Sequence, residues 1–183
     1  MDQNTAGSDI ERVIATQEQI VARLNELARE IEKDYSGKDL LIIGVLKGAV
    51  MTLSDFALKL NRHIEIDWMA VSSYGSGTKS SGVVRILKDL DRDITNRDVL
   101  IVEDIVDTGL TLAWLKSNLE SRGAKSVEIL TLLRKPEAAK VQVDVKYVGF
   151  DIPTDFVVGY GLDFNEKYRN LDFIGVLAKH MYS

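Results

Sequence analysis

The segment that decides the fold is VLIVEDIVDTGLT, residues 99–111. It begins with four apolar residues, the core of a buried strand. The adjacent carboxylates of Glu103 and Asp104 follow, then the turn residues DTG at 107–109. Leucines at helical spacing come next. This order of strand, acidic pair, turn and helix is typical of one unit of an α/β fold.

Two further segments repeat parts of this unit. Residues 40–45 (LLIIGV) form an apolar run of strand length, which a glycine-containing turn and a helical pattern through Leu60 follow. Residues 127–133 form a third such run. Strands that are apolar on both faces and alternate with helices predict an α/β fold with a twisted, mostly parallel sheet flanked by helices. Ligands bind such sheets at the carboxyl ends of the strands.

The patterns before and between these units are less regular. Residues 10–31 carry apolar side chains three and four apart, which predicts one amphipathic helix. Residues 1–8 are expected to be a flexible tail. Strand-like residues at 64–71 and 83–88 flank a small, polar segment, which we expect to be a mobile loop.

After Pro136 the chain contains short apolar runs at 147–150 and 156–160. We expect these runs to form a small subdomain, here called the hood, over the ligand-binding edge of the sheet. A chain of 183 residues with 45% hydrophobic residues suits one domain better than two. We therefore expect a single domain over residues 1–183, with a hood made from the N-terminal segment and residues 136–183.

Composition excludes several classes of protein. Without cysteine, the chain has no disulfide, thiolate nucleophile or sulfur ligand for a metal. A net charge of −5 argues against general nucleic-acid binding, which depends on clustered Lys and Arg. No apolar run approaches the ~20 residues that cross a bilayer, and residues 1–5 lack the pattern of a signal peptide. We expect a cytoplasmic protein that binds neither nucleic acid nor membranes.

The turn after the acidic pair can bind a phosphate. A helix that begins near Leu110 leaves its first N–H groups free, and the hydroxyls of Thr108 and Thr111 lie close in sequence. Gly109 permits close approach, while the two carboxylates suit the vicinal hydroxyls of a sugar and a divalent cation. Phosphate and diol together indicate a ribose 5-phosphate. The alternative is that the acidic pair is only solvated and that Asp107 is a helix N-cap.

Residues 99–111 resemble the phosphoribosyl pyrophosphate signature of the type I phosphoribosyltransferases: an apolar strand, an acidic pair and a threonine-rich turn. Other motifs resemble the hypoxanthine phosphoribosyltransferases of that family. VLKG at 45–48 is similar to their pyrophosphate-binding loop, and SYG at 73–75 to the start of their flexible loop. FDIP at 150–153 and FVVGYGLD at 156–163 are similar to their base-binding region.

The resemblance implies a magnesium-dependent enzyme of purine salvage. Such an enzyme transfers the 5-phosphoribosyl group of phosphoribosyl pyrophosphate to N9 of hypoxanthine, or of guanine, and yields IMP or GMP with pyrophosphate. Ser73 and Tyr74 would belong to a loop that closes over the reaction and excludes water. The resemblance also implies a homodimer or homotetramer.

The same resemblance assigns the residues that bind phosphoribosyl pyrophosphate. Glu103 and Asp104 would hold the ribose hydroxyls, and residues 107–111 the 5-phosphate. Together with Asp163, the acidic pair would help to place Mg²⁺, whose other ligands are mostly pyrophosphate, ribose oxygens and water. The pyrophosphate would be bound by Leu46, Lys47 and Gly48, with a cis Leu46–Lys47 peptide as one way to present the backbone, and by Arg169.

The purine would be bound mainly from the second half of the chain. Lys135 would donate to O6, Phe156 would stack on the ring, and Val157 would offer backbone groups to its edge. Asp163 would lie near that edge, and Asp107 is the candidate general base. Without the resemblance, Lys135 is an ordinary cation at the end of a strand. Phe156 and Val157 are then equally typical of a strand in the core.

Two other classes of protein remain possible from the sequence. One is a regulator that keeps the phosphoribosyl pyrophosphate site but binds nucleic acid, which the net charge disfavours. The other is a phosphate-accepting aspartate protein, because a strand that ends in Glu103 and Asp104 resembles the acidic strand end of response-regulator receivers.

Overall fold

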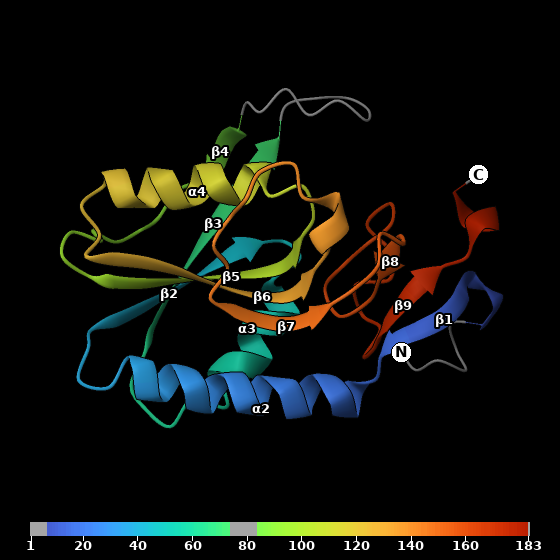
Figure 1. The fold of residues 1–183 in the computed structure, drawn as a ribbon, viewed down its shortest axis with the longest axis horizontal. Coiled ribbons are helices and arrows are strands. Elements are labelled where there is room, and N and C mark those ends of the chain that lie inside the picture. The colour runs from blue at the N-terminus through green and yellow to red at the C-terminus, as the bar shows by residue number, and fades with distance from the viewer. Residues whose placement is uncertain (1–6, 74–83, 183) are drawn as a thin grey trace.

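A six-stranded sheet forms the centre of the molecule (Figure 1). The computed structural model describes residues 7–73 and 84–182. All neighbouring strands of the sheet are parallel except β3 and β4, so the predicted mostly parallel sheet is confirmed. In spatial order, the strands are β4 (Val84–Lys88), β3 (Glu65–Ser73), β2 (Leu40–Leu46), β5 (Asp98–Val106), β6 (Ser126–Arg134) and β7 (Tyr147–Asp151).

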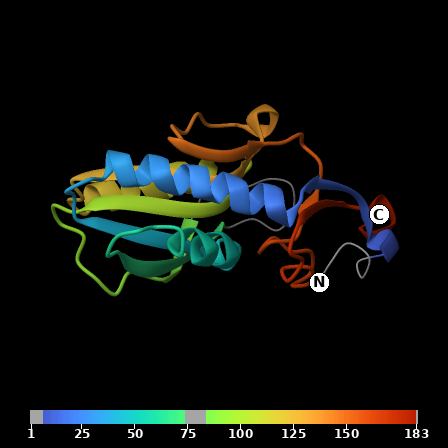
Figure 2. The same cartoon turned by 90° about the horizontal axis from the view of Figure 1, so that it is seen from below.

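Helices cover both faces of this sheet (Figures 1 and 2). Helices α2 (Gln17–Asp34) and α3 (Val50–Ala57) lie on one face, and α4 (Leu110–Ser121) lies on the other. Alternate residues of each central strand face opposite layers of helices. Leu40 and Ile42, for example, pack in the core with residues of α2 and α3. This explains why the strands are apolar throughout. No helix within residues 7–73 and 84–182 is long and apolar enough to cross a membrane.

The hood contains a second, antiparallel sheet, in the order β1 (Ile10–Ala15), β9 (Ile174–Leu177) and β8 (Val157–Val158). The prediction of one helix over residues 10–31 is therefore wrong for its first six residues. These residues pair with β9, with Ile10 opposite Leu177. The helix begins later because Thr16 and Gln19 form a reciprocal capping box. The Thr-x-x-Gln pattern of Thr16 and Gln19 could have predicted this helix start from the sequence.

A second correction concerns β7. We expected residues 147–150 to belong to the hood, but β7 is an edge strand of the main sheet, parallel to β6. The buried Tyr147 anchors it in the core beneath α2. Arg23 of α2 covers the open edge, because its guanidinium donates to the carbonyls of Val148 and Gly149 at 2.8 and 3.2 Å.

The hood lies beyond the carboxyl ends of the parallel strands (Figures 1 and 2). It has a small apolar core, which includes Val158, Leu171, Phe173 and Leu177. Its remaining elements are short: η1 (Gly7–Asp9), which includes two residues of the predicted tail, and η3 (Lys179–Met181). A further 3-10 turn, η2 (Pro136–Ala138), follows β6. The hood thus faces the edge of the sheet where ligands are expected.

Candidate active site at the carboxyl ends of the strands

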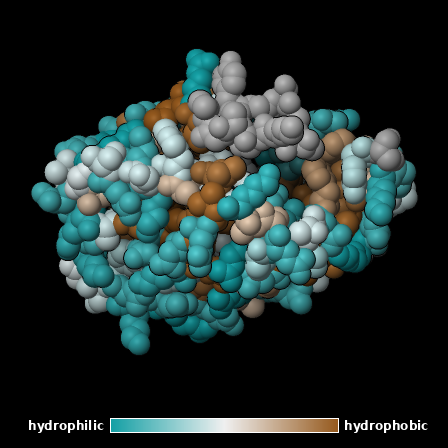
Figure 3. All heavy atoms as spheres, turned by 45° about the horizontal axis from the view of Figure 1, so that its top comes forward, coloured by the Kyte–Doolittle hydropathy of each residue, from teal (hydrophilic) through white to brown (hydrophobic). Residues whose placement is uncertain are grey.

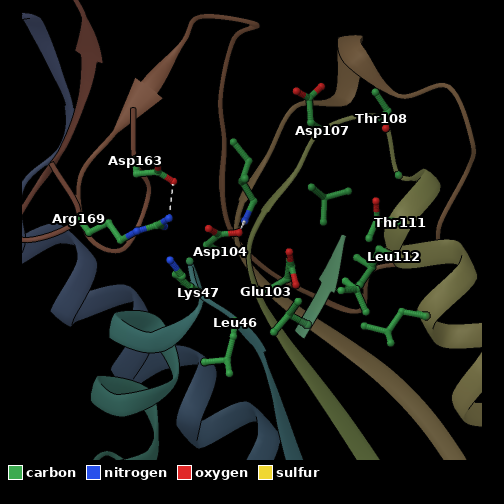
Figure 4. Close-up of a pocket in the computed structure, with 17 residues that line it drawn as sticks. Leu46, Lys47, Glu103, Asp104, Asp107, Thr108, Thr111, Leu112, Asp163 and Arg169 are labelled. Atoms are coloured by element: carbon green, nitrogen blue, oxygen red, sulfur yellow. Dashed lines mark hydrogen bonds and ion pairs between the residues drawn. The ribbon is translucent and has the colours of Figure 1, made fainter. Parts of the chain in front are cut away.

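A cavity of about 340 Å³ opens between the carboxyl ends of the strands and the hood (Figure 4). Its walls come from β2, β5, the start of α4 and the hood. It brings together most of the residues singled out from the sequence. These are Leu46, Lys47, Gly48, Glu103, Asp104, Asp107, Thr108, Gly109, Thr111, Asp163 and Arg169.

The acidic pair lies at the end of β5, on the cavity wall. One carboxylate oxygen of Glu103, Oε2, is enclosed and has no hydrogen-bond partner among the described residues. Burial, and then the charge of Asp104, raise the pKa of Glu103 well above its usual range. Burial also raises the pKa of Asp104 to about 6, although its carboxylate accepts a hydrogen bond from the Ile105 N–H at 2.7 Å. Burial therefore outweighs the contacts that stabilise the charged form of Asp104, and the Oε2 of Glu103 has no such contact among the described residues.

These carboxylates fit sugar hydroxyls or a hydrated divalent cation. Unpaired carboxylate oxygens accept hydrogen bonds from a diol, and they are the donors that Mg²⁺ prefers. Among residues 7–73 and 84–182, no three His, Asp or Glu side chains are grouped to hold a metal.

The turn from β5 to α4 leaves the helix start accessible. Gly109, with φ of 78°, is the N-cap, and no side chain caps the helix from that position. A Cβ on Gly109 would lie 2.7 Å from the carbonyl oxygen of Val141, so the turn needs glycine. The Thr108 carbonyl accepts hydrogen bonds from the Lys140 and Val141 N–H groups at 3.0 and 3.2 Å. These two hydrogen bonds hold the turn in place, and its N–H groups can face a phosphate.

The interpretation of Asp107 as the N-cap is wrong, because Gly109 holds that position. The Asp107 side chain is 53% exposed, and its Oδ2 lies 3.9 Å from Nζ of Lys135. Lys135 is buried just after β6, and its N–H donates to the Val106 carbonyl at 2.9 Å. It lines a second hollow of about 190 Å³, which shares Val106 and Asp107 with the main cavity.

The loop after β2 fits closely between β5 and the hood. The Leu46–Lys47 peptide is cis, in agreement with the sequence interpretation. A Cβ on Gly48 would meet Oδ2 of Asp104 at 1.5 Å, and one on Gly161 would meet the Gly48 carbonyl oxygen at 2.0 Å. The contact with a backbone atom, together with a φ of 102°, requires glycine at 161. Sequence reasoning identified Gly48 but not the matching role of Gly161.

Arg169 reaches the cavity from the hood (Figure 4). Its Nη1 donates to the Gly161 carbonyl at 2.8 Å, and its Nη2 lies 2.7 Å from Oδ1 of Asp163. The same Nη2 lies 3.3 Å from Oε2 of Glu166, which also accepts from Lys47 at 3.1 Å. The buried Nε of Arg169 has no hydrogen-bond partner within the described chain. Sequence reasoning missed Glu166, although NEKYR, residues 165–169, places an acid three positions before the arginine.

Two predicted base-binding residues lie outside both cavities. Phe156 is 41% exposed, and its ring contacts those of Phe164 and Tyr182, with centroids 5.8 and 5.4 Å away. Val157 is buried in β8, where it pairs with Val176. In the space-filling view, hydrophobic residues gather on the hood side of a largely hydrophilic face (Figure 3).

The remaining predicted residues have varied positions. Leu110 begins α4 but does not line the cavity. Ser73 ends β3, and Tyr74 lies outside the described residues, as does most of the expected loop. Apolar lining residues such as Val71 and Leu115 carried no signal, because in sequence they are like any other core residue.

Comparison with known proteins agrees with this geometry. The family model described as phosphoribosyl transferase domain matches residues 13–165. The hypoxanthine-guanine phosphoribosyltransferase of Mycobacterium tuberculosis is 58% identical over 180 residues, 95% of this chain and 89% of that protein. The crystal structure of a hypoxanthine phosphoribosyltransferase from Staphylococcus aureus is 48% identical, has a TM-score of 0.95, and covers 99% of this chain and 98% of that one.

A structure of the Trypanosoma cruzi hypoxanthine phosphoribosyl transferase is also similar, with 40% identity and a TM-score of 0.91 over 96% of this chain and 95% of that one. It was described for the role of its C-terminal region in oligomeric state and enzymatic activity. The domain match extends over well more than half of the chain. The chain therefore belongs to the phosphoribosyl transferase domain family.

Proposed function

We propose that the protein is a purine salvage enzyme that transfers the 5-phosphoribosyl group of phosphoribosyl pyrophosphate to N9 of hypoxanthine, and of guanine. The products are IMP or GMP and pyrophosphate. The observation that carries the proposal is one cavity that joins an acidic pair with an unpaired Glu103 oxygen, a helix start without a side-chain cap, and Arg169. These features suit a diol, a phosphate and a pyrophosphate. The names of relatives at up to 58% identity support the same reaction.

The substrate would bind across the junction of sheet and hood. Glu103 and Asp104 accept the ribose hydroxyls, and the N–H groups of residues 107–111 hold the 5-phosphate. The backbone of residues 46–48 and the guanidinium of Arg169 bind the pyrophosphate. The unpaired Nε of Arg169 supports this role, because a buried donor without an acceptor is costly until a ligand supplies one.

The purine would occupy the space beside Asp107, between the two hollows. Lys135 donates to O6 of the base, and Asp107 accepts the proton that the base loses as it attacks C1 of the ribose. Their distance of 3.9 Å supports a shared ligand, because one planar base can reach both groups. Phe156 and Val157 hold the ring and its edge from the hood, and Asp163 lies nearby.

Mg²⁺ is the implied metal, and when bound it neutralises charge on the leaving pyrophosphate. Glu103, Asp104 and Asp163 would contact its shell directly or through water. The raised pKa values of Glu103 and Asp104 fit this role, since a cation favours the ionised carboxylates.

We further propose that the chain acts as a single cytoplasmic domain with a hood, in a homodimer or homotetramer. The similarity to the Trypanosoma cruzi structure, which was described in relation to oligomeric state, supports an oligomer. Neither nucleic acid nor a membrane is proposed as a partner.

Steady-state assays test the function directly. The protein should convert hypoxanthine and guanine in the presence of phosphoribosyl pyrophosphate and Mg²⁺, and should lose activity when the metal is chelated. Xanthine and adenine complete the panel and define base preference. If RNA binds in a mobility-shift assay while no purine is turned over, the protein is a regulator rather than an enzyme.

A further inference from the structure

Glu166 occupies a position between two cations of the cavity. One oxygen, Oε2, accepts hydrogen bonds from Nζ of Lys47 at 3.1 Å and from Nη2 of Arg169 at 3.3 Å. These two cations come from opposite sides of the site, since Lys47 follows β2 and Arg169 belongs to the hood. A single carboxylate therefore bridges sheet and hood.

The backbone holds this carboxylate in place. Glu166 has φ of 61°, within a turn in which Asn165 and Tyr168 also have positive φ. Its N–H donates to Oδ2 of Asp163 at 2.9 Å, and Phe164 and Lys167 exchange two hydrogen bonds across the turn. This turn fixes the backbone position of Glu166, from which its side chain reaches both cations.

Arg169 is proposed to bind the pyrophosphate through its guanidinium, and the ammonium of Lys47 belongs to the loop whose backbone is proposed to bind it. A carboxylate oxygen shared by a lysine and an arginine resembles, in charge and geometry, one oxygen of a phosphate group. Pyrophosphate cannot pair fully with Arg169 and Lys47 while Glu166 holds them. We propose that Glu166 is an internal competitor of pyrophosphate, which holds the two cations in the free protein and reclaims them when pyrophosphate leaves.

The proposal rests on the proposed function, because the competitor matters only if pyrophosphate binds here. The expected effect is moderate. Glu166 is 65% exposed and Lys47 66% exposed, so water screens the bridge. The hydrogen bonds from Lys47 and then Arg169 lower the pKa of Glu166.

The test is calorimetric titration of the full-length protein with pyrophosphate in Mg²⁺. Glu166→Gln keeps the shape of the side chain but removes its charge, and it should bind pyrophosphate about three- to tenfold more tightly. The gain should shrink in high salt, because exposed charges are screened. In a Lys47→Met background the same change should gain less, because one of the two bridged cations is gone.

Asp155→Asn is the matched control. It removes the same charge from another hood carboxylate, which pairs with Arg12 and lines neither cavity. Its affinity for pyrophosphate should stay close to wild type. Equal tightening in Asp155→Asn would mean a general effect of charge and would overturn the proposal, as would unchanged or weaker binding by Glu166→Gln. A wild-type protein that binds no pyrophosphate and turns over no purine would instead overturn the proposed function.

Discussion

The main sheet and the hood contribute to the site in different ways. At the sheet edge, the proposed binding groups follow one another along the chain, from Glu103 near the end of β5 to Thr111 in the first turn of α4. In the hood, Arg169 and Phe156 depend on a sheet whose strands come from both ends of the chain. The first set is fixed by local sequence and the second by pairing between distant segments. Substitutions at the sheet edge and in the hood should therefore have different effects on activity and stability.

The largest expected effect is on base selection at the sheet edge. Because Lys135 is a buried donor, it should favour the O6 acceptor of hypoxanthine, whereas the amino group of adenine cannot accept its hydrogen bond. Discrimination of this kind can reach ~10⁴-fold. Measured kcat/KM values should show strong preference for hypoxanthine in wild type and a much smaller one in Lys135→Ala. Comparable wild-type rates with adenine would contradict the role of Lys135.

Asp107→Asn should have the next largest effect. Asn keeps the shape but lacks the basicity, so kcat should fall by ~10²-fold or more, the usual scale for loss of a general base. Since Gly109 is the N-cap, thermal stability should stay near wild type. Single-turnover kinetics should report the change in the chemical step. A near-normal chemical rate would remove Asp107 as the base and leave the reaction assignment intact.

Glu103→Gln should separate function from stability. Affinity for phosphoribosyl pyrophosphate, measured by calorimetry in Mg²⁺, should fall by about tenfold, because an amide is a poorer acceptor and a poorer partner for the cation. The free energy of unfolding should rise at pH 8, because the enclosed charge is gone. Lower stability with unchanged affinity would show that the acid pair is structural.

The stability that Glu103→Gln gains over wild type should increase with pH. The pKa of Glu103 is raised by folding, so folded wild type takes up more protons than the unfolded chain above the ordinary carboxylate range. Its free energy of unfolding therefore falls as pH rises through the raised pKa. Denaturation from pH 4 to 8 should show Glu103→Gln equal to wild type at the acid end and more stable at the alkaline end.

The smallest expected effect tests the hood. A Cβ on Gly175 would lie 2.7 Å from Cγ2 of Ile10 and 3.1 Å from Cε2 of Phe173, so Gly175→Ala should overpack β1 against β9. A loss of about 1 kcal/mol is expected, with faster amide hydrogen exchange in β1 and β9 than in β5. Equal acceleration in β5 would mean that hood and sheet unfold as one unit.

The same contrast explains what the sequence could predict. The strand, acidic pair, turn and helix around Glu103 are adjacent in sequence, so the pattern indicated both the element order and the binding groups. By contrast, the apolar spacing of residues 10–15 suits a helix as well as a strand, and only the partner β9 decides between them. The contacts of Glu166 and Gly161 depend on a part of the hood where the backbone has positive φ values. The amino-acid composition of that segment does not predict those values.

The pairing of β1 with β9 also bears on the order in which the protein can form during synthesis. The strands of the main sheet and their helices can assemble from neighbouring segments as each one emerges from the ribosome. The first strand of the hood must wait for one of the last segments, since Ile10 pairs with Leu177. A nascent chain would thus hold a folded sheet with an open phosphate turn before Arg169 is in position. The proposed ligand-binding site would therefore be complete only after β9 has been synthesised.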